Sequence, residues 1–257
     1  MEHIIVGFAA ITASGLTLFS GFGLGTILLP VFALFFPIEV AIGMTAIVHF
    51  FNNLFKLSIL GKYASKIVVI KFGLPAIASA LPGAFLLLWF SNLDPVFSYH
   101  LGDSEFFIQP VGLIIGILIL LFALFELAPG LNTISFDEKY LPVGGILSGF
   151  FGGLSGHQGA LRTVFLLRCG LSKERFIATG VTVACLVDMS RLFVYSSRFT
   201  EAFKGGNISL LIVAVLSAFS GVFIGKRFLK KVTMHGIQLL VSIMLVLIAL
   251  GLISGII

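Results

Sequence analysis

Charged residues are scarce in this chain, and their scarcity decides the class of protein. Asp, Glu, Lys and Arg make up 11% of its 257 residues, whereas a soluble domain carries about 25%. No charged residue occurs between Glu2 and Glu39, and that gap is longer than the ~20 residues that a membrane-spanning helix needs. Together with a mean hydropathy of +1.15, this composition excludes a soluble domain and predicts an all-α, polytopic membrane protein.

Cysteine is nearly absent as well, and this absence argues against two kinds of site. Cys169 and Cys185 stand in apolar sequence and give no disulfide framework. No grouping of cysteine and histidine has the spacing of metal ligands, so we expect neither a metal nor another cofactor. The N-terminal Met-Glu-His-Ile lacks the basic region of a secretory signal, so we expect the first apolar run to remain in the mature chain.

Glycine, in contrast, is concentrated in two otherwise apolar stretches, residues 14–30 and 148–168. Each glycine costs about 1 kcal/mol relative to alanine in a helix, so several together predict an interrupted helix. The first interruption is predicted at Gly21, Gly23 and Gly25. The second stretch carries Gly149, Gly152, Gly153, Gly156 and Gly159. Two broken apolar hairpins, one in each half of a membrane chain, are typical of a transport site.

The two halves of the chain follow the same plan. Each begins with a Gly-broken run, at 4–36 and 141–169, that forms either a re-entrant hairpin or two thin crossings. Three full spans follow in each half, with a polar loop at 91–107. The predicted spans are 39–60, 67–90 and 108–128 in the first half, and 175–196, 207–226 and 235–256 in the second. This plan divides the chain into a first membrane repeat at 1–128, a linker at 129–140 and a second membrane repeat at 141–257.

The number of crossings predicts that the two repeats are inverted. The segment from Ala41 to Thr45 matches that from Ala178 to Thr182 at its Ala, Gly and Thr positions, which indicates a repeat. Whether a broken hairpin crosses the membrane twice or not at all, each half crosses an odd number of times. The halves therefore have opposite orientations, as is common in secondary transporters.

The distribution of basic residues predicts the orientation of the chain in the cell membrane. In a soluble protein a net charge of +5 would indicate a nucleic-acid partner, but here most basic residues fall on one side of the membrane and no nucleic acid is expected. Arg198 and Lys204 fall on the other side. Under the positive-inside rule the basic side is cytoplasmic, so both termini are predicted outside. The residues on the basic side are Lys56, Lys62, Lys66, Lys71, Lys139, Arg168, Lys173, Arg175, Lys226, Arg227, Lys230 and Lys231.

Arg162 is the leading candidate for a substrate-binding residue. It lies in an apolar segment, where an arginine costs about 2.5–3.5 kcal/mol, and it follows the second Gly-rich break by one helical turn. A helix that begins near Gly159 would direct free backbone N–H groups toward the break, and with the guanidinium they would form an anion site. The alternative is that Arg162 extends its charge to the cytoplasmic interface.

Polar residues of the other predicted helices complete the candidate site. Thr45, His49 and Asn52 recur on one face of the helix at 39–60, together with Asn53 and Lys56. His49 is suited to relay protons near neutral pH, and hydrogen bonding between helices is the alternative role. The predicted substrate ligands are Gly21, Gly23, Gly25, Thr45, His49, Asn52, Gly156, His157, Gln158, Gly159, Arg162 and Thr182.

Asp188 and Arg191 form a second candidate group. They are three residues apart on one predicted helix, so they can pair directly. They lie about 120° around that helix from Thr182, which favours a structural ion pair that faces a neighbouring helix. A proton-coupled or substrate-coupled switch is the alternative.

Several short motifs together resemble those of a known family. They are the Gly-rich segment from Ser20 to Gly25 that leads into Leu28-Leu29-Pro30, the segment 41–45, and their echoes at 152–159 and 178–182. In these motifs the chain resembles the sulfite exporter TauE/SafE family of membrane permeases. The resemblance implies transport, in the export direction, of sulfite, organosulfonates or related small anions.

These observations favour a secondary transporter and not an enzyme. The anion would be held at mid-membrane between the two breaks, and no ATPase motif occurs in the chain. Coupling to protons is one expectation, because an anion that moves alone is driven only by the membrane potential. The lipid bilayer and the small anion are thus the expected partners.

Two other functions remain as alternatives at this point. The segment from Gly153 to Gly156 has the Gly-x-Ser-Gly form of rhomboid-type intramembrane serine proteases, with Ser155 as the nucleophile. Such chemistry needs a general base within hydrogen-bond reach, and the candidates are His235 at the basic edge and His49 on another helix. A membrane assembly or chaperone subunit is the third reading, and inverted broken repeats have no evident use in it.

Overall fold

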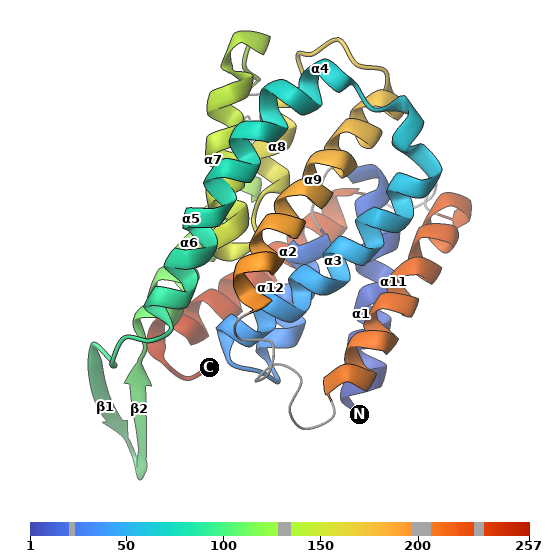
Figure 1. The fold of residues 1–257 in the computed structure, drawn as a ribbon. Helices are drawn as coiled ribbons and strands as arrows, with labels where there is room; N and C mark the ends of the chain where they lie inside the picture. The colour runs from blue at the N-terminus through green and yellow to red at the C-terminus, as the bar shows by residue number, and fades with distance from the viewer. Residues whose placement is uncertain (21–23, 128–134, 197–206, 229–233) are drawn as a thin grey trace.

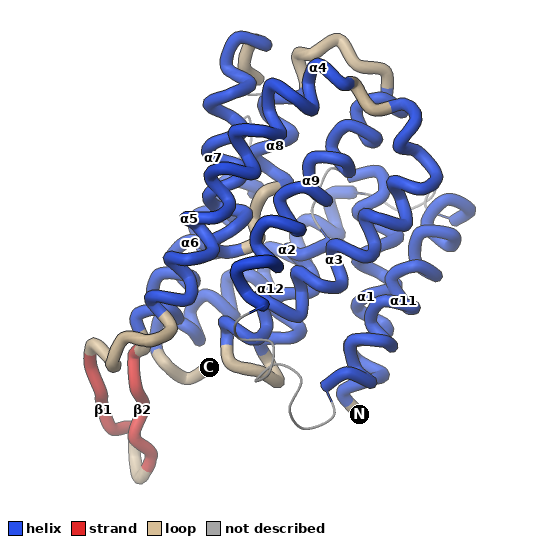
Figure 2. The backbone as a smooth tube through the Cα atoms, in the orientation of Figure 1, coloured by secondary structure: helices blue, strands red, loops and turns tan. Residues whose placement is uncertain are grey.

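The apolar runs of the sequence form helices in the computed structural model, which describes residues 1–20, 24–127, 135–196, 207–228 and 234–257 (Figures 1 and 2). Among these residues, four helices are long and apolar enough to cross a membrane. They are Ile38–Tyr63, Lys66–Phe90, Lys173–Tyr195 and Asn207–Gly225. As the composition predicts, the fold is that of a helical membrane protein.

The observed helices agree closely with the predicted spans. In the first half they are α1 (Glu2–Ser20), α2 (Leu24–Ala33), α3 (Ile38–Leu60), α4 (Lys66–Val68), α5 (Leu74–Phe90) and α6 (Pro110–Leu127). In the second half they are α7 (Leu141–Ser155), α8 (Gly159–Leu166), α9 (Lys173–Tyr195), α11 (Asn207–Phe228) and α12 (Met234–Ser254). Short 3-10 turns at Gly61–Tyr63 and Glu138–Tyr140, and a π-helical segment at Val69–Gly73, connect or extend them.

Helices of the two halves pack against one another in pairs. Helix α5 packs along α7, and α1 packs along α11 (Figure 1). Helix α3 contacts α9, and α6 contacts α12. Each pair takes one helix from each half, so the halves interlock and do not form two separate bundles.

The second Gly-rich stretch is only partly a helix break, which differs from the prediction. Gly149, Gly152 and Gly153 lie inside α7. At Gly145, Gly149 and Gly153, spaced four residues apart, an added Cβ would collide with the backbone of α5 or of the π-helical segment that precedes it. The carbonyl groups that it would meet belong to Phe72, Ala76 and Ala80. These glycines therefore allow two helix backbones to approach closely, as small residues do in membrane proteins.

The break itself is confirmed at residues 156–158. Helix α7 ends at Gly156, whose φ of +82° is the left-handed conformation that glycine adopts readily, and its N–H donates to the Gly152 carbonyl. Helix α8 then begins at Gly159. After α8 the chain returns to the segment just before α7, where Arg168 and Asp137 form an ion pair of 3.3 Å. In the first half, α1 ends at Ser20 and α2 begins at Leu24, and Gly21 and Gly23 lie outside the described residues.

The predicted polar loop at 91–107 contains a β-hairpin, so the all-helical expectation is wrong here. Strand β1 (Phe97–Leu101) pairs antiparallel with β2 (Ser104–Ile108). Gly102, with a φ of +63°, sits in the turn between them, where a positive φ matches the twist of a tight hairpin. The Tyr99 hydroxyl donates to the Ser254 carbonyl at 2.7 Å and ties the hairpin to the end of α12.

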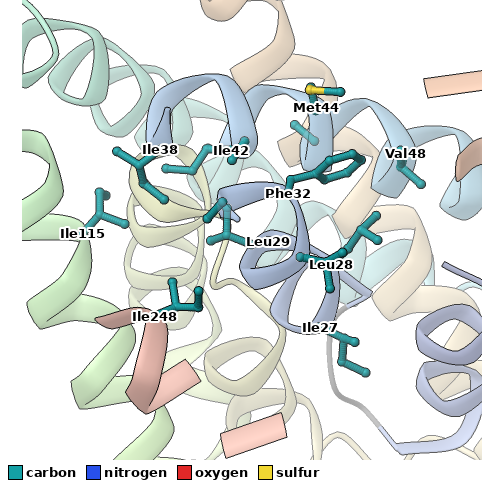
Figure 3. Packing of buried hydrophobic residues seen from close by; sticks show 14 of the residues in the cluster. Ile27, Leu28, Leu29, Phe32, Ile38, Ile42, Met44, Val48, Ile115 and Ile248 are labelled. Atoms are coloured by element: carbon teal, nitrogen blue, oxygen red, sulfur yellow. The ribbon is translucent and has the colours of Figure 1, made fainter. Parts of the chain in front are cut away.

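The apolar interior is centred on α2. All ten residues of this helix are buried. Figure 3 shows Leu28 and Phe32 of α2 among apolar side chains of α3, α6 and α12. Large apolar residues are also exposed on the outside, such as Phe193 at 76% and Leu247 at 63%. A soluble protein would not expose so many apolar side chains, and a lipid-facing surface accounts for them.

Candidate functional site

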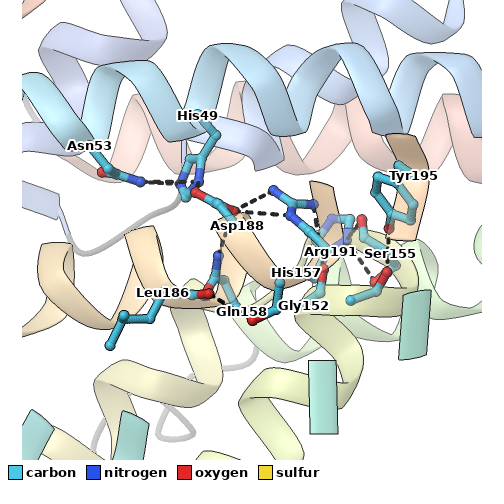
Figure 4. A network of polar contacts seen from close by, with 12 residues as sticks. His49, Asn53, Gly152, Ser155, His157, Gln158, Leu186, Asp188, Arg191 and Tyr195 are labelled. Carbon is cyan, nitrogen blue, oxygen red and sulfur yellow. Dashed lines mark hydrogen bonds and ion pairs between the residues drawn. The ribbon is translucent and has the colours of Figure 1, made fainter. Parts of the chain in front are cut away.

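Asp188 is the centre of a buried polar network that joins three parts of the fold (Figure 4). From α3, the His49 ring places Nδ1 2.6 Å from Oδ2 of Asp188. From the second break, Gln158 donates its side-chain amide to Oδ1 at 3.2 Å. From α9 itself, Arg191 donates two hydrogen bonds to Oδ1, at 3.0 and 2.8 Å. The expected Asp188–Arg191 ion pair is therefore present, and it is linked to both other elements.

This network lies almost entirely away from solvent. The exposed fraction is 0% for Asp188, 1% for Gln158, 1% for Arg191 and 5% for His49. A buried charge is tolerated when it is paired and hydrogen-bonded, and Asp188 meets both conditions. Gly156 leaves room for the guanidinium, because a Cβ at that position would lie 3.0 Å from Nη1 of Arg191.

The polar face predicted on α3 is present and buried. Its members are Thr45, His49, Asn52, Asn53 and Lys56, each with an exposed fraction of 5% or less. The amide nitrogen of Asn53 lies 3.1 Å from Nδ1 of His49. The hydroxyl of Ser14, on α1, donates to Oδ1 of Asn52 at 2.9 Å. The face is therefore hydrogen-bonded to α1 within its own half of the chain and to Asp188 in the second half.

The first turn of α2 approaches the second break beside this polar face. A Cβ added to Gly25 would lie 3.5 Å from the Thr45 methyl group and 3.8 Å from the Gly156 carbonyl oxygen. On this face and in the second break, three buried polar atoms have no hydrogen-bond partner among the described residues: Oγ1 of Thr45, Nδ2 of Asn52 and Nε2 of His157. Unpaired buried polar atoms are rare in native structures, and a bound ligand is one way to satisfy them.

Arg162 lies in the first turn of α8, immediately after the break. Its Nη1 donates to the Gln158 side-chain oxygen at 3.4 Å, and its Nε faces Gly180 of α9, where a Cβ would lie 3.4 Å away. The side chain is half-buried. The first backbone N–H groups of α8, starting at Gly159, have no partner within the helix and point toward the break. The positive end of the helix and the guanidinium thus lie together, as predicted.

Thr182 and His157, two of the predicted substrate ligands, contact groups other than Asp188. Thr182 donates its hydroxyl to the Ala178 carbonyl of its own helix at 2.8 Å and takes no part in the Asp188 network. His157 stacks on Phe122 of α6, with ring centroids 5.3 Å apart, and its Nδ1 lies 3.1 Å from the Ser155 carbonyl oxygen.

The contacts of Ser155 differ from those expected of a nucleophile. Its hydroxyl donates to the Phe151 carbonyl at 3.0 Å and lies 3.3 Å from Nδ1 of His157. His49, one of the two expected bases, is bonded to Asp188. The other, His235, has a side chain outside the described part of the chain. Both Ser155 and His157 are buried, with exposed fractions of 1% and 5%.

Sequence reasoning missed two contributors to this centre. Tyr195 donates its hydroxyl to the Gly153 carbonyl, and Ser148 donates to the Gln158 carbonyl at 2.9 Å. Lys56, which the three- and four-residue spacing predicts on the polar face with His49, lies inside α3. Although it is counted among the basic residues of the cytoplasmic side, its exposed fraction is only 4%.

The fold and the site define a class of protein: an integral membrane protein whose buried polar centre adjoins a helix break at residues 156–158. The chain belongs to the sulfite exporter TauE/SafE family, whose model matches residues 4–252. Neither the comparison with curated proteins nor that with solved structures finds a match. Membership implies a membrane exporter of sulfite or a related sulfur anion. It gives no support to a rhomboid-like protease.

Proposed function

We propose that this chain is a secondary transporter that exports sulfite or an organosulfonate across the cell membrane, with the anion bound at mid-membrane between the two Gly-rich breaks. The observation that carries the proposal is the charge of the buried centre. Asp188 is already paired with Arg191, whereas the hydrogen bond of the Arg162 side chain goes to the neutral amide of Gln158. Arg162 therefore has positive charge available to an anion.

Donors around the breaks support the same proposal. The free N–H groups at the start of α8 and the guanidinium of Arg162 face the break, and an anion is stabilised at such a helix end. The Thr45 hydroxyl and the amide nitrogen of Asn52 have hydrogens to donate and lack partners among the described residues. We include Gly156, Gly159, His157 and Gln158 in the site, with Gly21, Gly23 and Gly25 from the first break and Thr182 at its edge.

The repeat organisation is part of this proposal. We assign residues 1–128 and 141–257 to two inverted repeats, joined by the linker at 129–140, each beginning with a re-entrant hairpin. The helix pairs agree with a two-fold relation that exchanges the repeats, because α5–α7 then corresponds to α11–α1, and the α3–α9 and α6–α12 pairs map onto themselves. The ion pair between Asp137 and Arg168 agrees with a hairpin that leaves the membrane on the side where it entered. Such repeats bind substrate at their interface.

The orientation proposal follows the basic residues. In Figure 1 both termini and the β-hairpin lie at one end of the molecule, and α4 lies at the other. The exposed residues Lys62 and Lys66 belong to the α4 end. Under the positive-inside rule this end is cytoplasmic and both termini are outside.

We further propose that His49 and Asp188 couple transport to protons. The pair bridges α3 of the first repeat and α9 of the second at 2.6 Å. A proton that binds the imidazole adds a charge at this interface, so it changes the contact between the repeats. The same carboxylate is hydrogen-bonded to Gln158 in the break, which links the proton site to the anion site.

Flux in proteoliposomes tests the proposed function. The full chain is reconstituted, sulfite or methanesulfonate is loaded, and a pH gradient is imposed. We expect flux that responds to the gradient and falls at least tenfold in Arg162→Ala, because a charged hydrogen-bond partner of the anion is removed. Arg168→Ala is the matched control: this arginine is exposed, and its ion pair with Asp137 is worth little. Equal flux in Arg162→Ala and Arg168→Ala would show that the anion binds elsewhere.

A further inference from the structure

Lys56 is a buried lysine with no acidic partner among the described residues. It lies on α3, two helical turns beyond His49, with an exposed fraction of 4%. None of the ion pairs found among the described residues includes it: these join Asp188 with His49 and with Arg191, and Arg168 with Asp137. A charged amine that is buried without a partner is costly, so its presence requires an explanation.

The Lys56 amine does not reach the membrane surface, so contact with water does not explain how its charge is tolerated. Lysines near the end of a spanning helix usually bury the alkyl chain and leave the amine in water. Lys62 and Lys66, close to the end of α3, are exposed in this way, but Lys56 is not. The burial of Lys56 therefore places its charge within the protein and not at the cytoplasmic edge.

Lys56 and Arg162 lie along the same stretch of α9. On either side of Lys56 in the sequence, His49 is bonded to Asp188 and the Ser65 N–H donates to the Thr179 hydroxyl at 2.9 Å. Nε of Arg162 faces Gly180 within that stretch, so the positive charges of Lys56 and Arg162 repel each other and raise the positive potential of one region. Asp188 attracts Arg162 from a distance, but its oxygens are bonded to His49, Gln158 and Arg191. Two cations thus lie along one part of α9, and among the described residues no carboxylate forms an ion pair with either of them.

We propose that Lys56 joins Arg162 in binding the transported anion, and that this second cation makes the site selective for oxyanions with two negative charges. The inference rests on the proposed transport function. A divalent oxyanion would neutralise both buried cations, whereas a monovalent sulfonate would leave one uncompensated in a medium of low dielectric constant. Specificity of this kind comes from the penalty imposed on the wrong ligand as much as from attraction to the right one.

Sulfate and methanesulfonate form a matched pair of probes, because both are tetrahedral at sulfur and they differ by one charge at neutral pH. Calorimetric titration of the purified full chain gives the Kd of each. We expect the wild-type chain to bind sulfate more tightly than methanesulfonate. In Lys56→Met, sulfate binding should weaken about 30-fold, the effect of removing one partner from a buried charge pair, and methanesulfonate binding about threefold or less.

Two further variants separate the effect of the charge at position 56 from the effect of substituting any lysine. Lys56→Arg retains the charge and should retain the preference for sulfate, whereas Lys66→Met removes an exposed lysine and should bind both probes as the wild type does. Because Lys56→Met replaces a buried charge with an apolar chain of similar length, its thermal midpoint without ligand should not fall.

The inference fails if Lys56→Met weakens both probes equally, or if the wild type prefers neither. In that event sulfite flux that depends on Arg162 would leave the proposed function intact. Absence of both binding and flux for sulfite, sulfate and methanesulfonate would overturn the two together.

Discussion

Asp188 accepts hydrogen bonds from α3, from the second break and from its own helix, so a single carboxylate holds the centre of the molecule together. Its exposed fraction is 0%, and Arg191 beside it is 1% exposed. The pair is therefore a point where a small chemical change has a large energetic effect, because the partner that remains is charged and buried.

The replacement Asp188→Asn tests this role at the scale of one residue. It leaves Arg191 buried without its counter-charge, which should cost about 3–5 kcal/mol and lower the thermal midpoint of the purified chain by roughly 10 °C. Asp137→Asn is the control, since it breaks an ion pair whose side chains are 58% and 60% exposed, and it should shift the midpoint by about 2 °C or less. Similar shifts in the two variants would contradict the account.

The sequence identifies charged and polar residues in apolar segments, but not all their partners. His49, Gln158, Arg162 and Asp188 stand out because such residues are costly in a membrane. The contact between His49 and Asp188 joins positions 139 residues apart, and no local pattern predicts it. Lys56 is counted on the cytoplasmic side because it lies near the end of its span, but its position along the helix does not predict that it is buried.

At the scale of elements, the packing of α7 on α5 depends on glycine. Gly145, Gly149 and Gly153 form a stripe along α7, and each faces the backbone of α5 or of the π-helical segment before it without room for a side chain. The stripe sets the separation of the two helices, and α7 in turn carries the break at 156–158 toward the centre of the molecule. Close packing of these two helices is therefore expected to position the site.

Gly149→Ala tests that role. Its new methyl group would collide with the α5 backbone, and overpacking of this kind typically costs about 1–3 kcal/mol. Gly43→Ala is the matched control, because Gly43 is buried in α3 with no atom within 4 Å of an added Cβ, and alanine should there gain up to about 1 kcal/mol of helix propensity. Thermal midpoints of the two variants should move in opposite directions, and a stabilised Gly149→Ala would show that the stripe does not control the packing.

The helix spans could be predicted because apolar length decides them, whereas the glycines could be interpreted only in part. Gly156 breaks the helix, while Gly149 and Gly153 allow it to pack, and composition does not distinguish the two uses. The four-residue spacing was the available signal. The β-hairpin was missed because its alternating residues, Phe97, Tyr99 and Leu101, lie in a segment interpreted only as polar.

At the scale of the whole molecule, the two proposed repeats meet where Gly25 lies near Gly156 and where α3 contacts α9. The proposed anion site and the His49–Asp188 pair both lie at this interface. A rocking motion of one repeat against the other would therefore expose the anion site to either side while changing the environment of the proton site. The sequence predicts this organisation through the number of spans and the similarity between halves, but it does not predict which helices of the two halves pair.

The measurement that tests the central claim most directly is the position of a bound anion. Selenite has the shape and charge of sulfite, and its selenium atom gives an anomalous signal in crystals of the full chain. The account predicts one peak between Gly25, Gly156 and Arg162, and its loss in crystals of Arg162→Ala. A peak confined to the cavity of about 330 Å³ beside Glu39 and Gln109, with none between the breaks, would contradict the account.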